Sequence, residues 1–165
     1  MNPSCAIFLH MDHQRHLLRH TVAALAYRAA RAFEGSPVDF ADFAGAGRTP
    51  AQILAHMGDL FDWALSIAEG AEKWHNAKPL PWPQEQERFF AVLQAFDARL
   101  ASNAPLYASI ERLFQGPVAD AFSHVGQIAM MRRLAGSPIR GENYYVAQIE
   151  AGSVGASQAE AVQPF

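Results

Sequence analysis

Two segments of this chain carry residues that could bind a metal ion or exchange protons. Asp120 and His124 are four residues apart, so a helix places the carboxylate and the imidazole one turn apart on one face. The residues around this pair are mostly apolar: Val118, Phe122, Val125, Ile128, Ala129 and Met131. Because burying an unpaired polar group is costly, the pair needs polar partners or a metal.

His56 is the third residue of interest, at the edge of the apolar arc of an earlier predicted helix. If His56 meets Asp120 and His124, two imidazoles and one carboxylate form a ligand set with open positions, which is typical of a catalytic metal site. The alternative is a self-satisfied Asp120–His124 pair, with His56 as an ordinary core histidine. Convergence of all three side chains on one point would decide between these interpretations.

Four further histidines lie in the first predicted helix or just before it. They are His10, His13, His16 and His20. A turn of about 100° per residue places most of them opposite the apolar row of that helix, so we expect them to face solvent or a partner subunit. His16 and His20 have a chelating spacing, but without supporting hydrogen bonds such a surface pair binds metal only adventitiously.

Glycine and proline residues divide the chain into long helix-forming segments. We expect helices at about 11–33, 49–69, 83–101 and 117–135. Thr49 and Pro50 suit an N-cap and a first helical position, and Gly70 suits the stop of the same helix. Gly116-Pro117 is expected to begin the last helix. Runs of β-branched residues are almost absent, which leaves little strand potential.

These helices predict an all-α fold, a four-helix bundle in a single domain over residues 1–165. The tail, residues 139–165, has no clear periodicity and is expected to pack on the bundle as an irregular segment. Its end, residues 155–165, is expected to fray. With 50% hydrophobic residues, a chain of 165 residues can bury a core without disulfides.

The charge balance narrows the classes of partner. The net charge is −3 and no basic stretch occurs, which argues against a nucleic-acid-binding face. No window has the roughly 18 unbroken apolar residues that a membrane span needs, and the first residues do not resemble a signal peptide. A single cysteine, Cys5, fits a reducing compartment. We therefore expect a cytoplasmic protein.

A histidine on the second helix, together with His124-Val125-Gly126-Gln127 on the fourth, resembles the DinB/YfiT-like superfamily of four-helix-bundle, metal-dependent enzymes. The resemblance covers roughly residues 11–145. In that family one histidine of the second helix and two histidines of the fourth, four residues apart, hold the metal. His56 matches the first of these and His124 the last, whereas Asp120 stands where the family has histidine.

This departure affects the expected cofactor. A carboxylate is a harder ligand than imidazole, so the preferred divalent metal shifts from nickel or zinc toward iron or manganese. Asp120 could equally mark a site that has been lost.

The resemblance implies a small-molecule transferase with a role like that of glutathione S-transferases, using a low-molecular-weight thiol such as mycothiol or bacillithiol. It also implies a homodimer. One alternative is a hydrolase that uses metal-bound water. The other is a non-catalytic dimeric bundle that binds small molecules or partners and has lost its metal site.

Several residues near the ligands have a functional and a structural interpretation. Gln127 could support His124 or form an interhelical hydrogen bond. Arg132 could hold an anionic substrate or compensate the end of its own helix. Glu142, Asn143 and Tyr144 follow that helix and could cover the site as a lid or substrate wall, or simply pack against the bundle.

Overall fold

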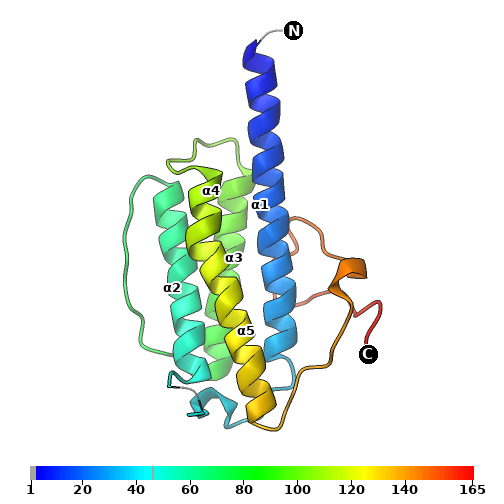
Figure 1. Ribbon diagram of the computed structural model, residues 1–165. Coiled ribbons are helices and arrows are strands. Elements are labelled where there is room, and N and C mark those ends of the chain that lie inside the picture. The colour runs from blue at the N-terminus through cyan, green and yellow to red at the C-terminus, as the bar shows by residue number, and fades with distance from the viewer. Residues whose placement is uncertain (1–2, 46) are drawn as a thin grey trace.

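The computed structural model describes residues 3–45 and 47–165, with side chains from residue 13 onward, and over this range the chain is helical and irregular without a strand. The side chains of Cys5 and His10 lie outside the described part. The prediction of an all-helical fold is therefore confirmed for the described residues. The long helices, which pack side by side as a bundle (Figure 1), are α1 (Pro3–Phe33), α2 (Pro50–Ala68), α3 (Trp82–Ala101) and α5 (Ala119–Leu134). The short elements are η1 (Phe40–Asp42), α4 (Ile110–Leu113), η2 (Phe114–Val118) and η3 (Tyr144–Val146).

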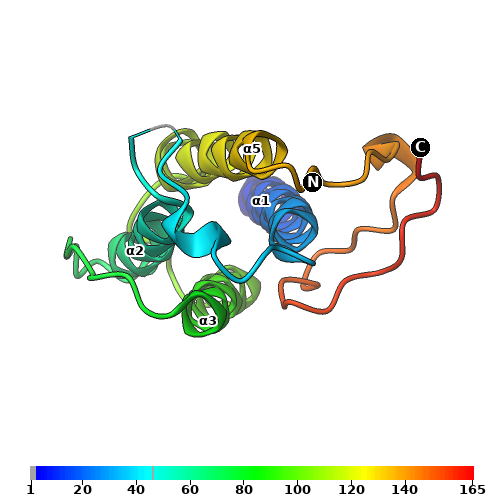
Figure 2. The same ribbon diagram turned by 90° about the horizontal axis from the view of Figure 1, so that it is seen from below.

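An apolar core lies between the four long helices (Figure 2). Phenylalanine rings form much of it, with edge-to-face contacts between Phe33 and Phe89 at 5.8 Å and a tilted contact between Phe61 and Phe96 at 5.7 Å. Leu25 of α1 and Ile128 of α5 are fully buried in the same cluster. Burial of these side chains is the main force that holds α2 and α5 in a fixed relative position.

The two ends of α2 lie where the sequence predicts them. Thr49 is the N-cap, its hydroxyl accepts a hydrogen bond from the backbone N–H of Gln52, and the Gln52 side chain accepts one from the Thr49 N–H. This capping box, followed by Pro50, satisfies backbone donors that would otherwise lack partners. Gly70, at φ +76°, adopts the left-handed conformation that follows the end of the helix.

Two helix boundaries differ from the prediction. Helix α1 begins at Pro3 rather than near residue 11, and its first turns project beyond the other helices (Figure 1). Proline suits a first helical turn, and no glycine interrupts the residues that follow it. The last helical run begins at Ile110, where the Ser109 side chain accepts from the Arg112 N–H.

Gly116-Pro117 therefore does not begin a helix. The two residues lie inside η2, a π-helical turn that continues directly into α5. Proline has no N–H and its ring clashes with the carbonyl four residues earlier, so a wider turn accommodates it within a continuous helical path. This turn immediately precedes Asp120 and so contributes to the rotation at which α5 presents its side chains.

The C-terminal tail lies outside α1, on the side away from α2 (Figure 2). Glu142 forms an isolated bridge with Pro164, and the Phe165 N–H donates to the Gly141 carbonyl over 2.9 Å. Tyr27 of α1 donates to the Glu142 carboxylate at 2.9 Å. Backbone hydrogen bonds thus close the tail on itself, and the fraying expected for residues 155–165 stays a prediction.

Among the described residues, no helix has the combination of length and apolarity that crossing a bilayer requires.

Candidate metal centre

Three of the residues singled out from the sequence meet between α2 and α5. Nε2 of His56 lies 3.6 Å from Oδ2 of Asp120, and Nε2 of His124 lies 3.5 Å from Oδ1 of the same carboxylate. The candidate ligand atoms of the three side chains all lie within 4.8 Å of one another. We call these residues the His–Asp–His cluster.

The spacing within the cluster fits ligands around an ion. Ligand atoms at the usual zinc distances in a tetrahedral site lie about 3.3–3.6 Å apart. The two nitrogen–oxygen distances, 3.5 and 3.6 Å, fall within that interval. They are longer than the roughly 2.7–3.2 Å of an ordinary N–H···O hydrogen bond. The two distances run to different oxygens of Asp120, and together with the 4.8 Å limit they make the spacing compatible with ligands around an ion.

Gln127 fixes the orientation and tautomer of His124. Its side-chain oxygen, Oε1, lies 3.0 Å from Nδ1 of His124. An amide oxygen can only accept, so Nδ1 carries the proton and donates it. In the neutral ring, Nε2 then presents a lone pair toward Asp120 and His56, which is the form that binds a metal.

His56 has an environment that keeps its imidazole neutral. Burial lowers the pKa of His56 below its ordinary value, and His124 lowers it further, while the Asp120 carboxylate acts in the opposite direction. The His56 ring packs at right angles to that of His124, with 4.9 Å between the centroids. On its other side it contacts the Trp74 ring at 5.8 Å. Near pH 7 the His56 imidazole is therefore neutral, and one of its two ring nitrogens carries a lone pair.

The cluster is buried at one side and open at the other. The His124 side chain is 11% exposed and that of Asp120 is 48% exposed. Three protein ligands leave positions free on a divalent ion, and the exposed side at Asp120 leaves room for a further ligand to reach it.

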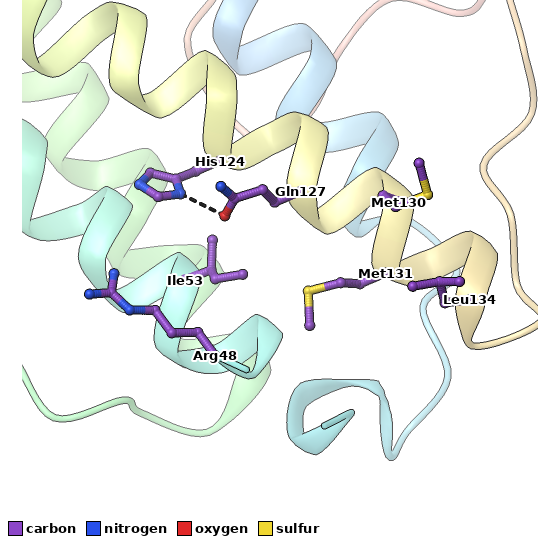
Figure 3. A pocket seen from close by; sticks show the side chains of 7 residues that line it. All are labelled: Arg48, Ile53, His124, Gln127, Met130, Met131 and Leu134. Atoms are coloured by element: carbon purple, nitrogen blue, oxygen red, sulfur yellow. Dashed lines mark hydrogen bonds between the residues drawn. The ribbon is translucent and has the colours of Figure 1, made fainter. Parts of the chain in front are cut away.

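A pocket of about 450 Å³ adjoins the cluster at His124 (Figure 3). We call it the His124 pocket. The side chains that line it are Arg48, Ile53, His124, Gln127, Met130, Met131 and Leu134. In Figure 3, the methionines and Leu134 come from α5. Ile53 comes from the start of α2, and Arg48 is the residue before the N-cap of that helix. His124 thus belongs both to the ligand set and to the wall of a cavity large enough for a small molecule.

A second group with metal-binding chemistry lies about one turn further along α2. It consists of Asp59, Asp62 and His75. Here a cation is already present, because Arg88 contacts Asp59 at 2.9 Å and Asp62 at 3.1 Å. The same guanidinium also contacts the fully buried Glu85 at 2.7 Å. This group is a salt-bridge network rather than a vacant ligand set.

Of the other residues singled out from the sequence, some lie at the His–Asp–His cluster and others lie away from it. Gln127 lies at the cluster. Arg132 does not: it is buried and donates to the carbonyls of Ala32 and Glu34 at 2.9 and 2.8 Å. The same guanidinium also donates to the Ser137 carbonyl at 2.8 Å, just beyond the end of its own helix, so Arg132 bonds at the C-terminal ends of both α1 and α5. This burial and bonding favour the structural interpretation of Arg132 over a substrate-binding role.

Glu142, Asn143 and Tyr144 do not form a lid over the cluster. The Arg31 guanidinium and the Tyr27 hydroxyl hold Glu142 against α1. Asn143 bonds to Gln163 within the tail, and the Tyr144 ring lies under the guanidinium of Arg28 at 3.9 Å. These contacts fix the tail on the face of α1 that is turned away from α2 (Figure 2).

Sequence reasoning missed the contribution of Arg48. It precedes the N-cap of α2, and no helical periodicity connects it with α5. The contact of Trp74 with His56 depends on the path of the irregular segment between α2 and α3. Neither residue has a local signature that would have placed it near the cluster.

Comparisons with known proteins add no identification. No family model, no curated protein and no solved structure matches this chain. Function is therefore inferred from the geometry of the cluster and the His124 pocket, together with the motif resemblance noted in the sequence.

Proposed function

We propose that His56, Asp120 and His124 bind a divalent metal ion and that the protein is a metal-dependent enzyme acting on a small molecule in the His124 pocket. The observation that carries this proposal is the convergence of the three ligand atoms within 4.8 Å, with the lone pair of His124 directed by Gln127. A hydrogen-bonded Asp–His pair alone would not need His56 at the same point.

The chain's own residues supply binding and orientation. Asp120 contributes the one formal negative charge of the ligand set, and Gln127 holds the His124 ring in the metal-binding tautomer. A divalent ion held here would lower the pKa of a coordinated thiol or water and so provide a nucleophile near neutral pH. The adjoining pocket would hold the electrophile next to that position.

Within this class we favour a transferase that uses a low-molecular-weight thiol. This choice depends on the resemblance to the DinB/YfiT-like superfamily, in which one histidine of the second long helix and a pair on the fourth hold the metal. The positions of His56 on α2 and of Asp120 and His124 on α5 support that correspondence. With a carboxylate in place of one histidine, manganese or ferrous iron is favoured over nickel or zinc. A metal-dependent hydrolase is separated from the transferase by whether activity requires an added thiol.

One observation favours a second candidate, a non-catalytic bundle with a lost site. Asp120 lies close enough to both imidazoles to compensate a proton on either of them. In that case the cluster would be a shared charge network without an ion, and the His124 pocket would serve only for binding.

Metal content per chain of the untagged protein tests the proposal. The protein is equilibrated with manganese, ferrous iron, zinc or nickel, desalted, and compared with His56→Ala and with the control His75→Ala, whose imidazole belongs to the Arg88 network. We expect near-stoichiometric metal in the wild type and in His75→Ala, and loss of metal in His56→Ala. Equal, low metal in all three proteins would support the lost-site candidate.

A further inference from the structure

One wall of the His124 pocket is apolar. Along α5, Met131 and Leu134 follow His124 by seven and ten residues, so helical periodicity places them on one face with it. Met131 and Ile53 are buried at the base of the pocket, whereas Met130 and Leu134 are more than half exposed at 55% and 57%. Large apolar side chains that remain exposed around a cavity indicate an apolar ligand surface, and methionine adapts easily to ligand shape.

The other wall carries a cation. Among the described residues that line the pocket, Arg48 is the one with a formal permanent charge, and none of them is a carboxylate. The arginines of the described residues that form ion pairs with Asp or Glu are Arg19, Arg31 and Arg88. Arg48 is exposed and lines the same pocket as His124, a member of the His–Asp–His cluster.

Two backbone N–H groups at the N-terminus of α2, those of the capping box, are not free to bind an anion in place of Arg48. The N–H groups of Thr49 and Gln52 are bonded to each other's side chains. The planar guanidinium of Arg48, with its fork of N–H donors, is therefore the group best suited to a carboxylate at this end of the pocket.

We propose that the His124 pocket binds a small amphipathic carboxylate. Its carboxylate would lie between Arg48 and the cluster, and its apolar part against Met130, Met131 and Leu134. The volume of about 450 Å³ falls at the lower end of the range for small-molecule sites, roughly 300–1,000 Å³, so a chain or ring of modest size fits. This assignment rests on the proposed function, because it names the substrate class for the same centre.

Calorimetric titration of the untagged full-length protein with octanoate tests the assignment. Titrations are made with metal-free protein and with protein loaded with manganese(II), and 1-octanol serves as the probe that keeps the chain and lacks the charge. We expect Arg48→Gln to raise the Kd for octanoate about tenfold or more, because a charge-assisted hydrogen-bonded contact is lost. Octanol binding should change less than twofold. Arg133→Gln, which removes an exposed arginine that does not line the pocket, should leave both unchanged.

A second variant tests the apolar wall. Leu134→Ser should weaken octanoate and octanol alike, because both use the same apolar surface. Octanoate binding that is equal in wild type and Arg48→Gln, or absent from both metal-free and loaded wild type, would overturn the inference. If no metal binds and octanoate still binds through Arg48, the ligand class stands and the proposed enzymatic function fails. If metal binds and octanoate does not, the proposed metal centre stands and the assignment of the ligand class fails.

Discussion

In α5, the Gln127 side-chain oxygen lies 3.0 Å from Nδ1 of His124, less than one helical turn away. This contact assigns the proton to Nδ1 and leaves Nε2 as the atom that faces the Asp120 carboxylate and His56. The motif therefore contains both a candidate ligand and the group that orients it. Each property of the cluster can be tested separately.

Removing the Gln127 amide should weaken metal binding without unfolding the protein. In Gln127→Leu, the His124 ring loses its acceptor and can rotate or change tautomer. Loss of such a supporting contact typically reduces metal affinity about 10–100-fold. Competition titration with a chromophoric chelator measures the affinity. Gln84→Leu, at an exposed position of α3, is the matched control, and equal affinity in the two variants would show that the contact has no role in binding.

Replacing Asp120 should change which metal binds. In Asp120→His the ligand set becomes three imidazoles, which removes one negative charge and favours zinc or nickel over manganese. After equilibration with an equimolar mixture of metals, elemental analysis of the desalted protein should show this shift relative to wild type. Asp120→Asn should bind every metal more weakly, because a neutral amide replaces a charged ligand. Unchanged metal selectivity in Asp120→His would mean that Asp120 is not a ligand.

Arg132 should matter for stability and not for metal binding. Its guanidinium donates to the carbonyls of Ala32, Glu34 and Gly35, where α1 ends. Arg132→Met leaves these acceptors without their charged donor, and we expect the free energy of unfolding to fall by about 2–4 kcal/mol. Denaturant titration measures the loss, and metal content per folded chain should stay at the wild-type value. A large decrease in metal with normal stability would instead place Arg132 at the site.

The sequence was informative wherever the deciding interaction is local. Asp120 and His124 share a face because the helical repeat fixes their relative direction, and no distant residue is needed to predict it. The start of α2 could likewise be predicted from the sequence, because Thr49 and Gln52 form a capping box and Pro50 occupies the first helical position, all within a few residues. The all-helical character follows from the same kind of local pattern.

Other features lacked a local signal. The sequence suggested a helix start at Gly116-Pro117, and the structure shows a π-helical turn inside a longer run, because Ser109 provides the earlier cap. Arg132 was placed correctly on a helix, yet three of the carbonyls that it contacts lie at or just after the end of α1. An arginine side chain can reach any acceptor that packing brings near, and its sequence neighbours do not reveal which one.

The sequence by itself determined the helical character, the caps of α2 and the pairing of Asp120 with His124, since all three depend on interactions within a few residues. Only the tertiary structure decided that His56 meets that pair, that Arg48 lines one pocket with the methionines of α5, and that Glu142 and Tyr144 lie on α1 instead of over the site. The reason is that these contacts depend on the depth and rotation with which α2, α5 and the tail pack against the rest of the chain. Apolar burial over the whole core sets these quantities, because it is non-directional and acts through many side chains at once.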